Sequence, residues 1–156
     1  DLLMKRLLIL TAILTMMVGA ANSQVLKPVK WQITFKKVSE GVYDIICKAT
    51  IESGWHLYDT KLPENGPQPT VFIMDEDESS DIELVGEFKA TTEAKVEKSE
   101  AFNMELKYFE ETVTFVQRVK LKKDTGKLVG TVEYMACSGS QCIPPAEEEF
   151  EFELKK

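Results

Sequence analysis

Apolar and polar residues alternate along most of the chain with a period of two. The pattern is clearest at residues 43–51 and near the end of the chain, where Phe150, Phe152 and Leu154 stand between glutamates. A period of two places alternate side chains on one face of a β-strand, whereas an amphipathic helix repeats every three or four residues. The pattern therefore predicts strands. The same reasoning predicts further strands at residues 31–35, 70–74, 82–85, 113–121 and 128–134.

Turn-forming residues separate these predicted strands. Clusters that contain Gly, Pro, Asn or Asp stand at residues 39–41, 63–67 and 124–126, as expected between strands. Seven or eight short strands with one apolar face each predict an all-β domain of two antiparallel sheets packed face to face. Residues 86–110 are charged and irregular, and we predict a long excursion there with at most one short strand. Composition leaves open whether it is a functional loop or a solvated crossover.

The first residues have the pattern of a secretory signal peptide. Lys5 and Arg6 precede an apolar run at residues 7–18, and small or polar residues follow. The run is about a dozen residues long, shorter than the roughly 20 that a membrane-spanning helix needs. We predict a signal peptide at residues 1–23 and a single β-sandwich domain at residues 24–156. This domain is expected in the periplasm or another exported compartment, without stable membrane insertion.

The net charge narrows the range of partners. The full chain has a net charge of −7, which becomes −8 without the predicted signal peptide because Asp1, Lys5 and Arg6 are removed. An acidic chain without a basic cluster is repelled by phosphate groups. We therefore expect no nucleic acid and no anionic membrane surface among the partners.

Three cysteines are the main candidates for chemistry. Cys47 shares a predicted strand face with Tyr43 and Ile45, which indicates a small buried core residue. Cys137 ends one predicted strand and Cys142 precedes another, with four residues between them. A tight hairpin can bring two Cα atoms within the roughly 4.4–6.8 Å that a disulfide requires, and an exported compartment permits that bond.

A bond between Cys137 and Cys142 is either a structural link or a redox site. A ring closed by so few residues constrains the unfolded chain by only about 2 kcal/mol, against about 4 kcal/mol or more for a bridge across most of a domain. A domain of this size has enough apolar core not to depend on the bond. A short loop at the end of two strands is also open to attack by the thiolate of another protein. Spacing alone does not decide between the two roles.

A metal site is a third alternative for the two cysteines. Structural zinc needs four ligands, and His56 is the only histidine in the chain. A copper site that adds the thioether of Met135 or Met104 has no spacing signature. The chain also has no readable Ser–His–acid triad and no phosphate-binding glycine loop. The sequence therefore predicts neither a metal nor a cofactor.

Three segments together resemble a known family, the N-terminal periplasmic domain of the thiol:disulfide interchange protein DsbD. Residues 54–58, Gly-Trp-His-Leu-Tyr, resemble a strand end of the family, and residues 97–102, Glu-Lys-Ser-Glu-Ala-Phe, resemble the segment after its cap loop. Residues 137–145 resemble its cysteine hairpin, which ends in two prolines. The order and the rough spacing of the segments agree, so the resemblance covers about residues 28–154.

The resemblance implies an immunoglobulin-like β-sandwich that passes electrons by thiol–disulfide exchange, as a protein-disulfide reductase does. It implies that Cys142 enters mixed disulfides and that Cys137 resolves them. The partners it implies are thioredoxin-like periplasmic oxidoreductases and a membrane electron donor, which we expect to be a separate protein. The alternative function is a non-catalytic binding module in which the disulfide is structural.

The resemblance also marks residues around the cysteines. His56 and Tyr58 match aromatic positions beside the cysteines of the family, and alternation places both on one strand face. His56 is a candidate acid or base for the thiol because histidine changes charge near neutral pH; from the residues alone, a surface histidine and a core-edge tyrosine are equally good readings. In the family an aromatic residue of the cap loop shields the disulfide. Residues 93–96 contain no aromatic residue, so we expect Val96 or Phe102 to take its place.

Overall fold

The computed structural model describes residues 25–139 and 141–156. The predicted signal peptide at residues 1–23 lies outside these residues, so the fold does not bear on it. Within the described residues, no helix is long and apolar enough to cross a membrane. All the regular structure described there is β-strand.

The described residues form eleven β-strands, more than the seven or eight that the alternation predicts. They are β1 (Val29–Ser39), β2 (Val42–Ile51), β3 (Trp55–Tyr58), β4 (Val71–Met74), β5 (Ile82–Ala90), β6 (Lys95–Ser99), β7 (Met104–Phe109), β8 (Thr112–Leu121), β9 (Thr125–Tyr134), β10 (Ala136–Ser138) and β11 (Ala146–Lys155). Each strand that the alternation predicts has a counterpart among them.

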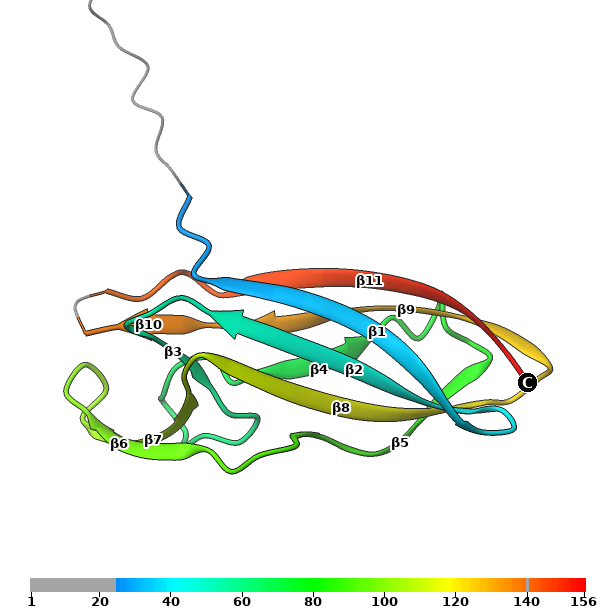
Figure 1. Cartoon of the computed structure of the whole chain (residues 1–156), viewed down its shortest axis with the longest axis horizontal. Coiled ribbons are helices and arrows are strands. Elements are labelled where there is room, and N and C mark those ends of the chain that lie inside the picture. The colour runs from blue at the N-terminus through cyan, green and yellow to red at the C-terminus, as the bar shows by residue number, and fades with distance from the viewer. Residues whose placement is uncertain (1–24, 140) are drawn as a thin grey trace, which may run out of the picture.

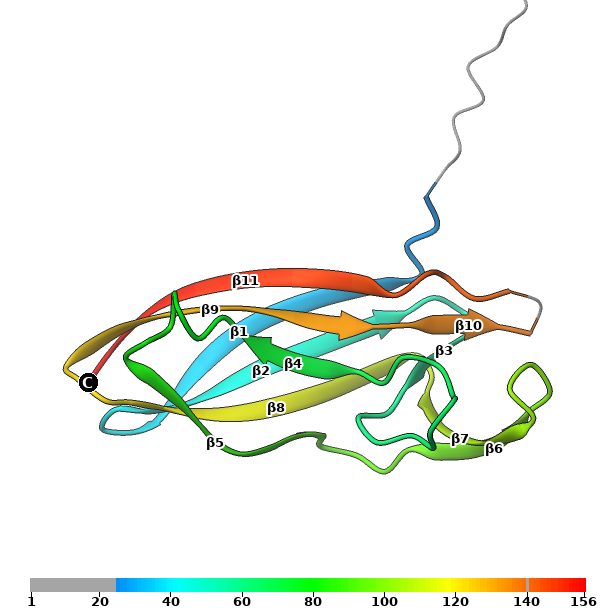
Figure 2. The same ribbon diagram turned by 180° about the vertical axis from the view of Figure 1, so that it is seen from behind.

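Two sheets face each other and enclose the core. One has the strand order β1-β2-β8-β5 and the other has the order β11-β9-β4 (Figure 1). A third sheet, β10-β3-β7-β6, extends the molecule at the end opposite the C-terminus, as Figure 2 shows from behind. All the strand pairs in the three sheets are antiparallel. The predicted all-β, immunoglobulin-like antiparallel sandwich is therefore confirmed.

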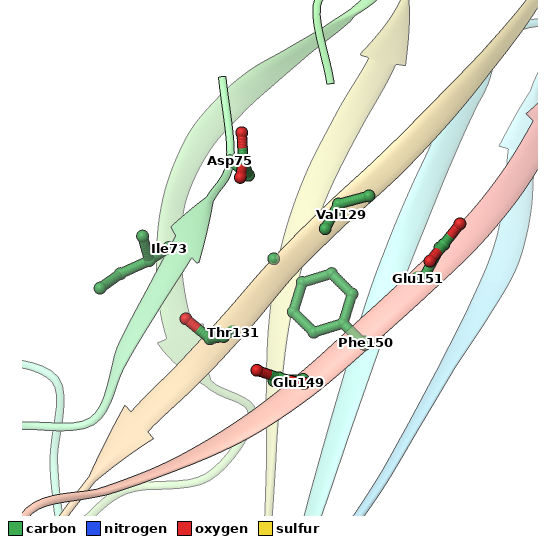
Figure 3. A pocket seen from close by; sticks show the side chains of 8 residues that line it. Ile73, Asp75, Val129, Thr131, Glu149, Phe150 and Glu151 are labelled. Atoms are coloured by element: carbon green, nitrogen blue, oxygen red, sulfur yellow. The ribbon is translucent and has the colours of Figure 1, made fainter. Parts of the chain in front are cut away.

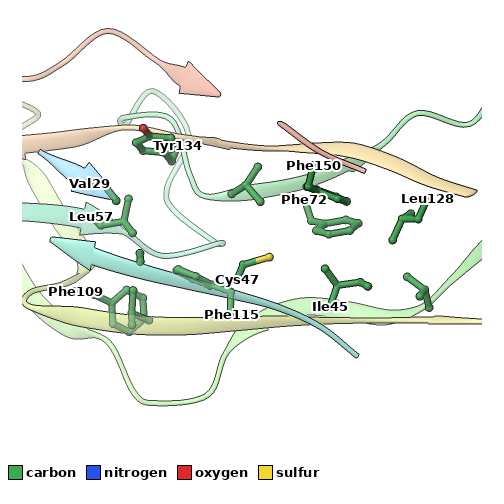
Figure 4. Packing of buried hydrophobic residues seen from close by; sticks show 14 of the residues in the cluster. Val29, Ile45, Cys47, Leu57, Phe72, Phe109, Phe115, Leu128, Tyr134 and Phe150 are labelled. Carbon is green, nitrogen blue, oxygen red and sulfur yellow. The ribbon is translucent and has the colours of Figure 1, made fainter. Parts of the chain in front are cut away.

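The alternation along each long strand builds the core between the facing sheets. In β2, Ile45 and Cys47 are fully buried, and Phe115 of β8 is buried beside them. Figure 4 shows these side chains between the two layers. Packing of this kind removes apolar surface from water, which is the main force that stabilises a sandwich. The prediction that Cys47 is a core residue is confirmed.

The prediction of a long irregular excursion at residues 86–110 is wrong. β5 continues to Ala90, and β6 and β7 form an antiparallel hairpin. The strand pattern is hard to see in the sequence because β6 is solvated on most of its length and β7 buries only Leu106 and Phe109. β5 is also interrupted: its register with β8 shifts after Val85, next to a glycine with a positive φ, as at a β-bulge.

A hollow on the sheet β11-β9-β4 is lined by residues of all three strands (Figure 3). Gly130 of β9 is one of the lining residues, and the ring of Phe150 from β11 packs against that position. A Cβ atom on Gly130 would lie 2.4 Å from the carbonyl oxygen of Ile73 and 2.7 Å from Cζ of Phe150. The glycine is therefore required by the close approach of β4 and of the Phe150 ring.

Replacing Gly130 with alanine is expected to destabilise the protein by about 1–3 kcal/mol, the cost of overpacking a filled interior. The carbonyl of Ile73 belongs to the backbone and cannot rotate away. Gly139→Ala is the matched control, because a Cβ atom there meets nothing within 4 Å. The free energies of unfolding from urea denaturation check the prediction, and equal values for the two variants would contradict it.

Candidate functional site

A hairpin brings Cys137 and Cys142 together at the end of the molecule opposite the C-terminus. β9 continues almost directly into β10, where Cys137 pairs across the ladder with His56 of β3. The amide of Ser138 donates to the carbonyl of Gln141 at 2.7 Å, which closes the turn. The chain then returns so that Cys142 lies opposite Cys137 in an isolated antiparallel bridge. The two cysteines form a disulfide, with their Cα atoms 4.0 Å apart.

The two cysteines of the bond differ in their access to solvent. Cys137 is only 6% exposed, because β3 covers it on one side and Leu106 of β7 lies in the same apolar cluster. Cys142 is exposed. After it the chain is anchored again by Ile143, which is buried in the main core and donates its amide hydrogen to the carbonyl of Ala136. The pair thus has one reachable end and one protected end.

One hollow collects the residues that the sequence singled out. Cys137, Cys142, His56 and Tyr58 all line it, together with residues 97–101 of β6 and the turn after it. β3 brings His56 and Tyr58 to this place because its other face, with Trp55 and Leu57, is used by the main core. This two-sided use of a short strand agrees with the predicted alternation.

Tyr58 supports the apolar floor of the hollow. It is almost fully buried in a small cluster with Cys137 and Leu106. Burial, and secondly the charge of Glu97, raise the pKa of the Tyr58 hydroxyl to about 12. Tyr58 therefore stays protonated and neutral at physiological pH and does not exchange protons with a thiol there.

His56 is held between two carboxylates. Its Nδ1 lies 2.8 Å from Oε1 of Glu97, and its Nε2 lies 3.0 Å from Oε1 of Glu110. Its ring stacks on the ring of Tyr108, with the centroids 4.0 Å apart. Lys95 completes the group through a 2.7 Å bond to the second oxygen of Glu110. Both ring nitrogens of His56 are thus engaged by side chains other than the cysteines.

Sequence reasoning missed the roles of Glu97, Glu110 and Tyr108. Glu97 appeared only as the first residue of a motif, and the other two stood in a segment that was expected to be irregular. Their meeting with His56 depends on the order β3-β7-β6 within one sheet. No local pattern in the sequence encodes that order.

The structure separates the two candidates for a shield over the disulfide. Phe102, in the turn between β6 and β7, packs against the cluster that contains Tyr58 and Cys137. Val96 is 58% exposed and lines a different hollow, beside Lys61 and Phe88. The side chains of Val96 and Glu97 point to opposite faces of β6 because successive residues alternate along a strand. Phe102, and not Val96, lies on the cysteine side.

The third cysteine, Cys47, and the glutamates of β11 lie outside the hollow. Burial raises the pKa of the Cys47 thiol to about 12, so Cys47 is not a thiolate at neutral pH and is chemically inert. Residues 147–149, whose charges would disfavour a thiolate, belong to β11 and do not line the hollow. Among the described residues, no three His, Cys, Asp or Glu side chains are grouped so that they would hold a metal ion.

Known proteins share this architecture. The sequence profile of the N-terminal region of the thiol:disulfide interchange protein DsbD matches residues 22–154. The reduced N-terminal domain of DsbD from Neisseria meningitidis has a similar fold, with a TM-score of 0.57 and 18% identity over 88% of this chain and 96% of that one. The N-terminal periplasmic domain of ScsB from Proteus mirabilis gives a TM-score of 0.58 and 16% identity over 86% of this chain and 49% of that one.

The two solved structures establish the fold, and the family profile establishes the relationship. This chain spans about half of the ScsB domain chain that it matches. No sequence among curated proteins matches it significantly. Because the profile covers almost the whole of the described chain, from before β1 to the last residues of β11, the protein belongs to the family of DsbD N-terminal domains.

Proposed function

We propose that this protein is an exported thiol:disulfide interchange protein that passes electrons between redox partners through Cys137 and Cys142. The observation that supports the proposal most strongly is the asymmetry of the pair: an exposed Cys142 bonded to a buried Cys137 at the end of a hairpin. A purely structural bond gains nothing from having one sulfur accessible, whereas exchange requires it.

The exchange proceeds in two displacements that conserve electrons. The Cys142 thiolate of the reduced protein attacks one sulfur of a partner disulfide, and the other partner sulfur leaves as a thiolate. The Cys137 thiolate then attacks the sulfur of Cys142 in the mixed disulfide, forms the Cys137–Cys142 bond and releases the second partner thiolate. Two electrons pass to the partner, and its two thiolates take up protons from solvent.

The family and the site together suggest the partners and the compartment. The family profile of an interchange protein and the periplasmic domain of ScsB both favour a periplasmic location. The proposed division into a cleaved signal peptide at residues 1–23 and a working domain at residues 24–156 rests on the sequence pattern. Thioredoxin-like periplasmic oxidoreductases are the proposed acceptors, and a membrane protein is the proposed donor. Tyr58 backs Cys137 from the apolar side, and His56 lies beside it on the neighbouring strand.

The redox equilibrium of the pair tests the proposal against a structural disulfide. A carrier has to exchange with glutathione buffers whose ratio of oxidised to reduced form is near that of other oxidoreductases. The fraction of reduced protein is measured by thiol labelling after equilibration in a series of such buffers. A sigmoidal titration within the range of known oxidoreductases supports the carrier; a pair that stays oxidised at every ratio supports the binding module.

Removal of the Phe102 ring is expected to expose the disulfide. A half-buried phenyl ring contributes about 1 kcal/mol to a packed turn, so Phe102→Ala should raise the rate of reduction by a phosphine reductant about fivefold. Val96→Ala is the control, because Val96 lies on the opposite face of β6 and should leave the rate unchanged. Equal rates for the two variants would show that the turn does not shield the bond.

A further inference from the structure

A group of charged side chains joins the three strands beside the disulfide. Glu97 is on β6, His56 is on β3, and Tyr108 of β7 lies between those strands and stacks on the His56 ring. The bond from His56 to Glu97 therefore spans the whole width of β7. The bond from His56 to Glu110 ties β3 to the residue that follows β7.

These side-chain bonds matter because the backbone link is short. β3 and β7 pair only at Leu57 with Phe109 and at Tyr58 with Tyr108. The next pair in the same register would be His56 with Glu110, where the backbone ladder has ended and the side-chain bond takes over. The β6–β7 hairpin is thus held to the cysteine-bearing strands partly by this group.

The contacts of His56 require a particular protonation state of its ring. A neutral imidazole has one nitrogen with a hydrogen and one with a lone pair, so only one of its nitrogens donates a hydrogen bond. Both nitrogens of His56 lie within hydrogen-bond distance of a carboxylate oxygen. Only the protonated ring donates to both; a neutral ring places a lone pair against one carboxylate.

We propose that protonated His56, between Glu97 and Glu110, is a pH-dependent clamp that positions the β6–β7 hairpin over the Cys137–Cys142 disulfide and so limits access to it. The turn of this hairpin carries Phe102 and forms one wall of the hollow around the two cysteines. Loss of the proton on His56 breaks one of the two bonds and lets the hairpin move away from the cysteines. His56 is then a positioning residue, and the acid–base role toward the thiol falls away because no ring nitrogen is free.

The other groups around His56 keep their charge while it changes. Lys95, hydrogen-bonded to Glu110, holds the pKa of that carboxyl below its usual range, and Glu110 in turn raises the pKa of Lys95. Burial, Glu97 and Glu110 raise the pKa of the Tyr108 hydroxyl, so the stacked ring stays neutral. Tyr58 is neutral and Cys137 is in the disulfide. The change of charge in the cluster is therefore assigned to the His56 ring, whose two nitrogens face the two carboxylates.

The rate of reduction of the disulfide by a phosphine reductant, measured from pH 5 to pH 8, tests the clamp. At each pH this rate is divided by the rate at which the same phosphine reduces oxidised glutathione, and the ratio removes the pH dependence of the reagent. We expect the relative rate of the wild type to rise about threefold to fivefold as the pH increases, the size typical of a partly exposed ion pair. His56→Gln should be flat at the high value, and Glu97→Gln should have a reduced slope.

Lys61→Gln is the matched control. It removes a charge from an ion pair with Glu87 that lines a different hollow, and its profile should follow the wild type. The clamp is wrong if His56→Gln keeps the slope of the wild type, or if the wild-type profile is flat. If His56→Gln does not fold, a Glu97→Gln variant that keeps the slope of the wild type contradicts the clamp in the same way. The clamp rests on the proposed function only in that it would regulate exchange with partners. If the clamp is wrong, exchange with partners is still expected. If exchange with partners is not found, the pH profile of reduction by the phosphine is still expected.

Discussion

Replacing Cys142 with alanine is expected to abolish electron transfer to a thioredoxin-like oxidoreductase, a fall of about 100-fold or more, because no second accessible sulfur can form the mixed disulfide. Cys137 remains in this variant, but it is buried beneath β3 and the β6–β7 hairpin. The rate is followed as oxidation of the reduced protein by the partner, with thiol labelling at each time point.

Cys47→Ala is the control for this variant. It also removes one sulfur, but from the core, where the thiol is buried and inert. Its exchange rate should equal that of the wild type. A Cys142→Ala variant that retained more than a small fraction of the wild-type rate would mean that Cys137 reaches the partner, which would reverse the roles proposed for the two sulfurs.

Replacing Phe115 with alanine is expected to destabilise the protein by about 3–5 kcal/mol, the usual cost of deleting a fully buried phenyl ring. The ring has no exposed surface and contacts the rings of Trp31, Phe88 and Phe109, with centroids 5.3–6.0 Å away. The neighbours come from three different strands, so they cannot collapse together into the space. The free energy of unfolding from urea denaturation measures the loss.

Lys120→Ala, an exposed position on the same strand, is the control for Phe115→Ala and should change the free energy of unfolding by less than about 0.5 kcal/mol. Phe109 lies at the end of β7, next to the residue that binds His56. Loosening the core at Phe115 should therefore also loosen the hairpin beside the disulfide. A loss of less than about 1 kcal/mol would show that the core refills around the missing ring.

The long strands could be predicted from the sequence because the sandwich has one solvated face on each sheet. In β2, β8 and β11 the alternation of apolar and polar residues reports directly which side chains enter the core. The same alternation placed Cys47 in the core and put His56 and Tyr58 on the face opposite Trp55 and Leu57.

The hairpin of β6 and β7 could not be predicted in the same way. Its strands bury little, so the stretch from Lys95 to Phe109 has the composition of a solvated loop. What makes it a pair of strands is its place at the edge of a sheet formed by segments distant in the sequence. His56 contacts Glu97 and Glu110, which lie 41 and 54 positions away in the sequence, and both contacts depend on that placement.

The difference between the two cysteines also comes from tertiary structure. Both stand in the same short segment, and nothing in the spacing shows which sulfur is covered. The pairing of Cys137 with β3, and the absence of such a partner strand on the outer side of Cys142 among the described residues, determine that Cys142 is the accessible one.

Trapping with the Cys137→Ala variant is the most direct test of whether Cys142 exchanges with a partner protein. In this variant the mixed disulfide cannot be resolved from within the protein, so a partner that attacks or is attacked by Cys142 stays attached. The variant is expressed in cells, and its exported form is isolated from the periplasm. Free thiols are then blocked, and disulfide-linked peptides are mapped by mass spectrometry. We expect a covalent complex that joins Cys142 to a cysteine of a thioredoxin-like protein and that reductant separates. No complex through Cys142, together with a wild-type bond that stays oxidised in every glutathione buffer, would contradict it.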